Sequence, residues 1–404
     1  MKNSLYIPCF LALLLLFSCK TDQAVESTSP INEQTLTERL NALSQKAVSD
    51  LAEIPVDSLK IPRSLDENGA LEATNSRDWT SGFYPGLLWQ LSKADNGKAL
   101  QEAAEKWTAF IEKEKWDDHT HDLGFKLFCS FGQGHEITEQ EAYKDVIIQA
   151  SKTLIQRYND TVGCIKSWDF NEDVWKFPVI IDNMMNLDML FTATQWTGDS
   201  TFYNIAYQHA LTTMKNHFRE DNSSYHVIDY DPSTGEIRNR HTHQGAAHES
   251  AWSRGQAWGL YGFTMAYRYT KDTRFLEQAK AIAQYFFDHP NLPEDKIPYW
   301  DFDAPNIPNE LRDVSAAAVA TSGLLELYHF DDANKDQYLA WADAVLESLQ
   351  QTEYQADAPP FLLQHSVGSI PGEFEVDVPI VYADYYYVEA LFRRLDIAKQ
   401  GDRE

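Results

Sequence analysis

The sequence predicts an all-α protein with a single domain, a closed (α/α)6 barrel in which six helical hairpins form a ring. Apolar residues recur at three- and four-residue spacing in about a dozen segments. An aromatic residue followed by alanine opens several of them, at Tyr143, Tyr203, Phe275 and Tyr338, and the interval of roughly 60 to 70 residues is the length of one hairpin. No Pro-, Gly- or Ser-rich linker divides the chain after residue 34.

The helical pattern predicts twelve helices, and strand-like alternation is confined to short stretches such as 225–230 and 370–378. Twelve helices make six pairs, which can close into inner and outer layers with a cup of loops at one end. An open solenoid is the alternative, but its terminal faces would need polar caps. The expected helices are residues 35–53, 80–94, 98–114, 122–131, 139–157, 181–196, 200–218, 251–270, 273–288, 312–329, 335–351 and 381–397.

The first residues have the pattern of an export signal. Lys2 is followed by the apolar run 11–17, then by Ser18 and Cys19. The run is too short for a transmembrane helix, and a small residue before cysteine is similar to a bacterial lipobox, so we expect lipidated Cys19 to anchor an exported protein in the outer membrane. An ordinary secretory signal with an incidental cysteine is the alternative. The expected division is signal peptide 1–18, flexible tether 19–34 and catalytic domain 35–400.

Composition narrows the class of protein. Of 404 residues, 43% are hydrophobic and 13% aromatic, which excludes a largely disordered chain. The net charge of -27, without a basic stripe, argues against nucleic acid. The 11 tryptophans and 20 tyrosines suit the C–H faces of sugars, although most belong to an ordinary core. Cys129 and Cys164 are too few for a disulfide scaffold.

A long polar stretch, 216–249, is a candidate substrate cup, because loops between such helices are usually short. The helix after it carries Trp252, Arg254 and Trp258. The two tryptophans could instead anchor the core, whereas an arginine inside a helix calls for an anionic partner. The polar side chains of the stretch include His226, Arg238, Arg240, His241, His243, Gln244 and His248.

Three of these histidines, His241, His243 and His248, could in principle bind zinc. Their spacing fits no defined zinc pattern, so we expect polar loop residues and no metal.

Two aspartates are candidates for acid chemistry. Asp182 follows the run 177–181, Phe-Pro-Val-Ile-Ile, and precedes Met184 and Met185, so its carboxyl must be paired or have a raised pKa. It could be a general acid that is protonated near neutral pH, or a helix N-cap. Asp122 lies beside His121 and also fits either role.

Five segments in this order resemble the unsaturated glucuronyl hydrolases, glycoside hydrolase family 88. They are RDWTSGFYPGLLW at 77–89, HDLGF at 121–125, IIDNMMNL at 180–187, AWSRGQAWGLYGF at 251–263 and EVDVPIVYADYYYVEAL at 375–391. The resemblance implies the (α/α)6 barrel and substrates made by polysaccharide lyases, with a C4=C5 double bond in the terminal uronate. It implies no cofactor.

The resemblance also implies residue roles. Asp182 would protonate C4 of the vinyl ether and help water to add at C5, with Asp122 assisting. Arg254 would meet the uronate carboxylate. Further substrate contacts would come from His121, His226, Gln244 and the aromatic walls Trp79, Trp168, Trp252 and Trp258.

Members that prefer sulfated substrates carry a Ser-x-x-Ser-x-Lys loop. This chain has Ser366 and Ser369 as candidate contacts, followed by Ile370 and Pro371 in place of the lysine, which argues against a 6-sulfated amino sugar. Three alternatives stay open: an unsaturated rhamnogalacturonyl hydrolase of family 105, a non-catalytic glycan-binding lipoprotein, and an epimerase on a similar barrel.

Overall fold

The computed structural model describes residue 1, residues 31–95 and residues 97–401. The chain divides into the units Met1–Pro30 and Ile31–Glu404, and the second contains every element below. The expected signal peptide and Cys19 lie outside the described residues. Within the described part of the chain, no helix combines the length and apolar character needed to cross a membrane.

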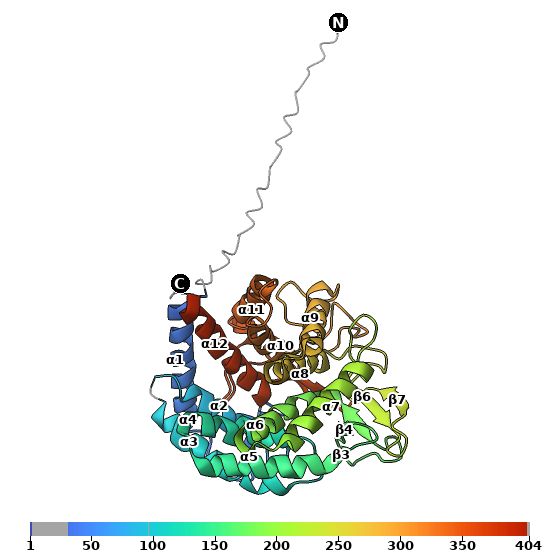
Figure 1. Cartoon of the computed structure of the whole chain (residues 1–404). Coiled ribbons are helices and arrows are strands. Elements are labelled where there is room, and N and C mark those ends of the chain that lie inside the picture. Colours follow the sequence, from blue (N-terminus) through green and yellow to red (C-terminus); the bar gives the residue numbers. More distant parts are fainter. Residues whose placement is uncertain (2–30, 96, 402–404) are drawn as a thin grey trace. The chain divides into compact units, whose positions relative to one another are not determined.

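Helices build most of the unit Ile31–Glu404 (Figure 1), as the sequence predicts. The α-helices are α1 (Glu33–Asp50), α2 (Phe83–Leu91), α3 (Lys98–Ala109), α4 (Gln133–Thr138), α5 (Glu141–Leu154), α6 (Leu187–Thr197), α7 (Ser200–Asn216), α8 (Ser253–Thr270), α9 (Thr273–Asp288), α10 (Val314–Leu327), α11 (Lys335–Ser348) and α12 (Val381–Gly401). Shorter 3-10 turns are η1 (Trp79–Gly82), η2 (Glu112–Trp116), η4 (Ile155–Arg157), η5 (Ile181–Asn186) and η6 (Thr352–Tyr354), and η3 (Gly124–Gly132) is a π-helix that continues into α4.

The helices form two concentric layers. The inner ring runs α2, η3 with α4, η5 with α6, α8, α10 and α12, and it closes because α12 packs against α2. The outer helices are α1, α3, α5, α7, α9 and α11, each packed against an inner helix. Every residue of α10 is buried, whereas α9 buries only one apolar stripe, which is the difference expected between an inner and an outer helix. The closed (α/α)6 barrel is therefore confirmed, and the open solenoid is wrong.

Short antiparallel strands lie in the connections between helices. The pairs are β1 (Ile61–Leu65) with β2 (Leu71–Thr74), β3 (Tyr158–Asn159) with β4 (Cys164–Ile165), and β8 (Ser366–Ser369) with β9 (Phe374–Val378). A three-stranded sheet has the order β5 (Pro178–Ile180), β6 (Val227–Tyr230), β7 (Ile237–His241). The strand-like stretches 225–230 and 370–378 of the sequence correspond to β6 and β9, and the other strands were not predicted.

The inner helices all point the same way. Residues at or just before their N-terminal ends line one cavity, while Gln90, Arg268 and Arg393, which lie further along, line a second cavity. Arg254 and Arg268 are 14 residues apart on α8, which corresponds to about 21 Å along the helix axis. The residues at the N-terminal ends are Trp79, Asp122, Asp182, Arg254 and Tyr382. Because helix N-termini carry partial positive charge, the first cavity favours an anion.

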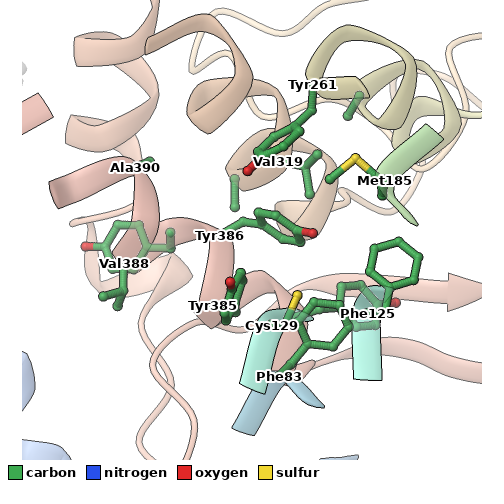
Figure 2. Close-up of a cluster of buried hydrophobic side chains, with 14 of the residues drawn as sticks. Phe83, Phe125, Cys129, Met185, Tyr261, Val319, Tyr385, Tyr386, Val388 and Ala390 are labelled. Atoms are coloured by element: carbon green, nitrogen blue, oxygen red, sulfur yellow. The ribbon is translucent and has the colours of Figure 1, made fainter. Parts of the chain in front are cut away.

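Aromatic side chains fill the barrel between the two cavities (Figure 2). The ring of Phe83 lies 5.5 Å from Phe125, 5.4 Å from Tyr385 and 5.9 Å from Tyr386, measured between centroids. These rings come from α2, η3 and α12, so they tie three inner helices together.

A close helix contact holds η5, the segment of Asp182, against α8. A Cβ atom on Gly262 of α8 would lie 2.4 Å from the Cβ of Met184, so only glycine fits at this crossing. The side-chain oxygen of Asn186 accepts hydrogen bonds from the backbone N–H groups of Gly124 (2.9 Å) and Phe125 (3.3 Å). These contacts fix the two segments that carry Asp182 and Asp122.

Candidate active site

A cavity of about 420 Å³ opens at the N-terminal ends of the inner helices, within the size range of small-molecule sites. It brings together seven of the twelve candidate catalytic and substrate-binding residues of the sequence analysis: Trp79, His121, Asp122, Trp168, Asp182, Gln244 and Arg254. The other five, His226, Trp252, Trp258, Ser366 and Ser369, are not among the described residues that line it.

Asp182 is a buried acid on the cavity wall. Its side chain is 11% exposed, and burial raises its pKa to about 7, against the lowering effect of Arg254 and with a smaller rise from the negative charge of Asp122. Its Oδ2 atom has no hydrogen-bond partner among the described residues. The N-cap of η5 is Ile180, so the capping alternative for Asp182 is wrong. Of the two states that the apolar neighbours of Asp182 allow, a paired carboxylate or a raised pKa, the structure agrees with the raised pKa.

His226 directs an N–H group at this carboxyl. Its Nδ1 accepts hydrogen bonds from the backbone N–H groups of His243 (3.1 Å) and Gln244 (3.2 Å), so the proton of the neutral ring is on Nε2. Nε2 lies 3.7 Å from Oδ2 of Asp182. Burial lowers the pKa of His226 well below its ordinary value, so the ring stays neutral. Although His226 does not line the cavity, it contacts the acid from behind.

The indole N–H of Trp258 acts on the same carboxyl and lowers its pKa, although the geometry falls short of a full hydrogen bond. Two donors therefore face Asp182 from the protein side, and both favour its ionised form.

Asp122 faces the cavity from the segment before η3. Its Oδ2 accepts a 2.6 Å hydrogen bond from the hydroxyl of Thr120, and its Oδ1 lies 3.1 Å from Nε2 of His121. Burial lowers the pKa of His121, an effect that the carboxylate of Asp122 opposes. These contacts orient the Asp122 carboxyl, whose side chain is 20% exposed, toward the cavity.

Arg254 is buried and already has an anionic partner. Its Nη1 donates to Oδ2 of Asp313 (2.8 Å) and to the carbonyl of Val367, and its Nη2 donates to the carbonyl of Gly368 (2.8 Å). Its Nε has no partner within the described chain. The anionic partner expected for a buried arginine is therefore Asp313 at the start of α10, and one edge of the guanidinium remains for a ligand.

Aromatic side chains form part of the cavity wall. Trp79 packs 4.9 Å from Tyr382, and Trp168 stacks on Phe170 at 4.7 Å with an interplanar angle of 22°. Phe170 and Phe374 are exposed at the rim, 46% and 41% respectively. A sugar could stack on such faces.

Trp252 and Trp258 do not form walls, which corrects the sequence-based expectation. Trp252 is 2% exposed and its ring packs on the guanidinium of Arg254 at 4.5 Å, and Trp258 is fully buried. Trp252 is the N-cap of α8 and Trp258 lies in its second turn, and both side chains are buried, so the alternative of core anchors holds.

The β8–β9 hairpin contributes backbone rather than hydroxyl groups. Ser366 and Ser369 are buried, and the Ser369 hydroxyl accepts a hydrogen bond from the backbone N–H of Gly372 (3.0 Å). The carbonyl of Gly368, between them, accepts hydrogen bonds from Arg254 and from the amide of Gln244 (3.1 Å). The two serines are therefore not among the described residues that line the cavity, as they were expected to be.

The polar stretch 216–249 supplies His243 and Gln244 to the cavity. His241 instead stacks on His248 at 4.3 Å, while His243 packs on Trp168. Among residues 31–95 and 97–401, no group of three or more His, Cys, Asp or Glu is arranged to hold a metal ion.

Sequence reasoning missed several residues of the site. They are Thr120, Phe170, Asp313, Phe374, Glu375 and Tyr382. Of these, Glu375 and Tyr382 lie in the last of the five family-like segments, and Asp313 was detectable as the N-cap before the helix at 314. Phe170 lies in a connection without a periodic pattern, and Phe374 lies in the strand-like stretch 370–378, where nothing in the pattern marked it as a site residue.

Comparison with known proteins agrees with this geometry. The chain is 45% identical over 403 residues to an unsaturated glucuronyl hydrolase of Formosa agariphila, covering 98% of this chain and 99% of the relative. A crystal structure of an unsaturated glucuronyl hydrolase specific for heparin superposes with a TM-score of 0.87 at 42% identity, covering 91% of this chain and 98% of the other. The enzyme from Bacillus sp. GL1 gives a TM-score of 0.82 at 29% identity, with coverage of 89% and 96%.

The model of Glycosyl Hydrolase Family 88 matches residues 60–291, which include both aspartates and Arg254. The resemblance carried by the five sequence segments is thereby confirmed. With this match and its full-length relatives, the chain belongs to glycosyl hydrolase family 88.

Proposed function

We propose that this hydrolase removes a terminal 4,5-unsaturated uronic acid from oligosaccharides released by polysaccharide lyases, with Asp182 as general acid. The observation that carries the proposal is the buried carboxyl of Asp182 on the cavity wall, whose pKa is raised to about 7. A carboxyl of this kind holds its proton near neutral pH and can deliver it. Family membership and the relatives named for unsaturated uronate chemistry support the substrate class.

The reaction is a hydration that ends in cleavage. The Asp182 proton adds to C4 of the C4=C5 vinyl ether, and positive charge develops at C5 and the ring oxygen. Water then adds at C5 and returns a proton to the Asp182 carboxylate. The resulting hemiketal opens, which breaks the link between the ring oxygen and C5 and lets the remaining sugar depart from C1.

The environment of Asp182 suits both halves of this cycle. Before transfer, burial and the charge of Asp122 hold the proton on the carboxyl. After transfer, the carboxylate faces the Nε2–H of His226 at 3.7 Å and the indole N–H of Trp258, both of which favour the ionised form. The carboxyl can therefore act as acid and then as base without either state being trapped.

The anionic end of the substrate is assigned to the wall of Arg254. Its Nε edge is unpaired within the described chain, and the nearby hydroxyl of Tyr382 also lacks a partner there. The guanidinium lies 5.2 Å from the Tyr382 ring centroid. A guanidinium N–H and a phenol hydroxyl are both donors to a carboxylate, and the convergent helix N-termini add favourable potential.

The leaving sugar is assigned to the rim, where Trp168, Phe170 and Phe374 offer faces for stacking. Ile370 and Pro371 stand where sulfate-preferring members carry lysine, which favours a leaving sugar without a 6-sulfate. An unsaturated rhamnogalacturonyl hydrolase would use the same acid and barrel, and only the leaving sugar distinguishes it.

We further propose that the protein is exported and anchored to the outer membrane through lipidated Cys19. The apolar run 11–17 followed by Ser18 and Cys19 supports this assignment. Expression with a radiolabelled fatty acid should label the wild-type chain and leave Cys19→Ser unlabelled.

The direct test is incubation with unsaturated disaccharides from several lyases, followed by the loss of ultraviolet absorbance of the double bond and by product mass. The mass must show addition of one water and separation of the two sugars, which an epimerase or a pure binding protein would not give. Asp182→Asn should show no turnover while its circular dichroism is unchanged. Normal turnover by this folded variant would refute the assignment of the acid.

A further inference from the structure

A second cavity, of about 360 Å³, lies beyond the aromatic layer, further along the inner helices from the candidate active site. Phe125 lines both cavities, and Trp258, buried beside it, packs 5.2 Å from Phe125 and 5.4 Å from Tyr386. Tyr261, Tyr385 and Tyr386, from α8 and α12, line the second cavity, and Figure 2 labels these three side chains in the aromatic cluster. Its volume falls within the range of small-molecule sites, about 300–1,000 Å³.

The two arginines of the wall are fixed by contacts with neighbouring side chains. Arg268 donates to Asp188 (2.6 Å) and to Glu326 (2.8 Å). Arg393 donates to the hydroxyl of Tyr261 (2.8 Å) and lies 3.1 Å from Glu326. Each arginine is therefore held between acceptors, and neither is a free cation waiting for an anionic ligand.

Gln90, near the C-terminal end of α2, is a buried polar group of this wall without such contacts. It lines the cavity and is 1% exposed, yet neither its Nε2 nor its Oε1 has a hydrogen-bond partner among the described residues. Leaving a buried amide without partners is unfavourable, so such a group calls for a partner. One donor and one acceptor side by side match a pair of hydroxyl groups, each of which can both donate and accept.

The charge of the cavity selects against anions. Three basic side chains and four acidic ones line it, and the negative ends of the inner helices point toward it. The acidic residues are Glu136, Asp188, Glu389 and Asp396, and the basic ones are Lys93, Arg268 and Arg393. This is the reverse of the candidate active site, where helix N-termini converge.

We propose that this second cavity binds a non-anionic hexose, stacked on the tyrosine rings and hydrogen-bonded through its hydroxyl groups to the Gln90 amide. Flat aromatic faces suit the C–H face of a sugar, and the amide supplies the polar contact that fixes its orientation. Both neutral and amino hexoses share this chemistry, whereas a uronate does not. The site is separate from the cavity of Asp182, so its existence does not depend on the reaction proposed above.

Calorimetric titration of the full chain with D-glucose, D-glucosamine and D-glucuronate tests the proposal. We expect saturable binding of glucose or glucosamine, and the comparison of the two tells whether the neutral or the amino sugar is preferred. Gln90→Leu should weaken that binding by about tenfold or more, because the hydrogen bonds of the amide are lost. Without sugar this variant should be at least as stable as the wild type, because an unpaired buried amide has been removed.

Trp168→Ala is the matched control, since Trp168 lines only the cavity of Asp182. It should leave the hexose affinity within about twofold of the wild-type value, because the two binding sites do not share this residue. The proposal is overturned if neither glucose nor glucosamine binds, if Gln90→Leu binds them as the wild type does, if Trp168→Ala abolishes their binding, or if Gln90→Leu weakens the binding of glucuronate as much as that of the other sugars.

Discussion

Replacing Asp182 by asparagine should make the protein more stable at pH 8 while it abolishes turnover. The carboxyl has a pKa of about 7 in the folded protein against an ordinary value of 3.8, because burial penalises the charge. A raised folded pKa contributes stability that is fully present below the unfolded pKa and is lost as pH rises through about 7. The amide of asparagine does not titrate, so the variant escapes this loss.

The magnitude follows from the size of the shift. A rise from 3.8 to about 7 is about 3 pKa units, and at 1.36 kcal/mol per unit the wild type loses about 4 kcal/mol between strongly acidic and alkaline pH. Between pH 5 and pH 8 the loss is about 3 kcal/mol, since part of it has already occurred at pH 5. Other buried acids, such as Asp384 with a pKa of about 8, titrate equally in both proteins and cancel in the difference.

The assay is equilibrium urea unfolding of wild type and Asp182→Asn at pH 5 and pH 8. The stability of the variant relative to the wild type should increase by about 3 kcal/mol from the lower to the higher pH. An equal difference at both pH values would show that Asp182 ionises at an ordinary pKa, and the assignment of a proton stored at this position would then be wrong.

Three further results are expected. The logarithm of kcat/KM should fall by one unit per pH unit above about 7 as Asp182 loses its proton, and a rate that stays level to pH 9 would contradict a protonated carboxyl acid at this position. Arg254→Ala should raise KM and lower kcat/KM by about 100-fold or more, since a buried charge pair is broken and the assigned uronate contact is lost, and unchanged kinetics would remove Arg254 from the site. Gly262→Ala should lower the free energy of unfolding by about 1–3 kcal/mol because its Cβ collides with η5, measured by urea unfolding. Gly259→Ala, whose Cβ meets its nearest side chains at 3.3 Å or more, is the control and should change stability far less, and equal losses in both variants would contradict the collision.

The ring of hairpins was predictable because an inner or outer helix must carry an apolar stripe at helical spacing. The helix 273–288 was predicted with the boundaries of α9, and most others differ by a few residues at their ends. The helix expected at 122–131 is the π-helix η3, which continues through α4 to Thr138. A wider helix has no separate signature in the spacing of apolar residues, so its form and its continuation could not be predicted.

Properties of a side chain that depend on its neighbours in the sequence were also predictable. Apolar residues on both sides of Asp182 indicated a raised pKa, which the structure confirms. Contacts between segments that are distant in the sequence were not predictable. The ion pair of Arg254 with Asp313, for example, joins the starts of two inner helices and links residues 59 positions apart. The path of the backbone after each loop decides where a side chain points, and the order of residue types does not predict this path. For this reason the burial of Trp252, Trp258 and the two serines of β8 was not predicted.

Because the six inner helices share one direction, the protein can accept some changes in sequence length and not others. The chain segments that enter the ring at the end of Asp182, such as the β8–β9 hairpin, can be lengthened or exchanged at their turns without altering how the helices pack, provided that contacts such as those of Val367 and Gly368 with Arg254 are kept. New partner sugars can thus be accommodated by editing these connections, while the acid itself stays on η5 against α8. Insertions inside an inner helix have no such freedom, since they would rotate everything that follows them out of register with both neighbours.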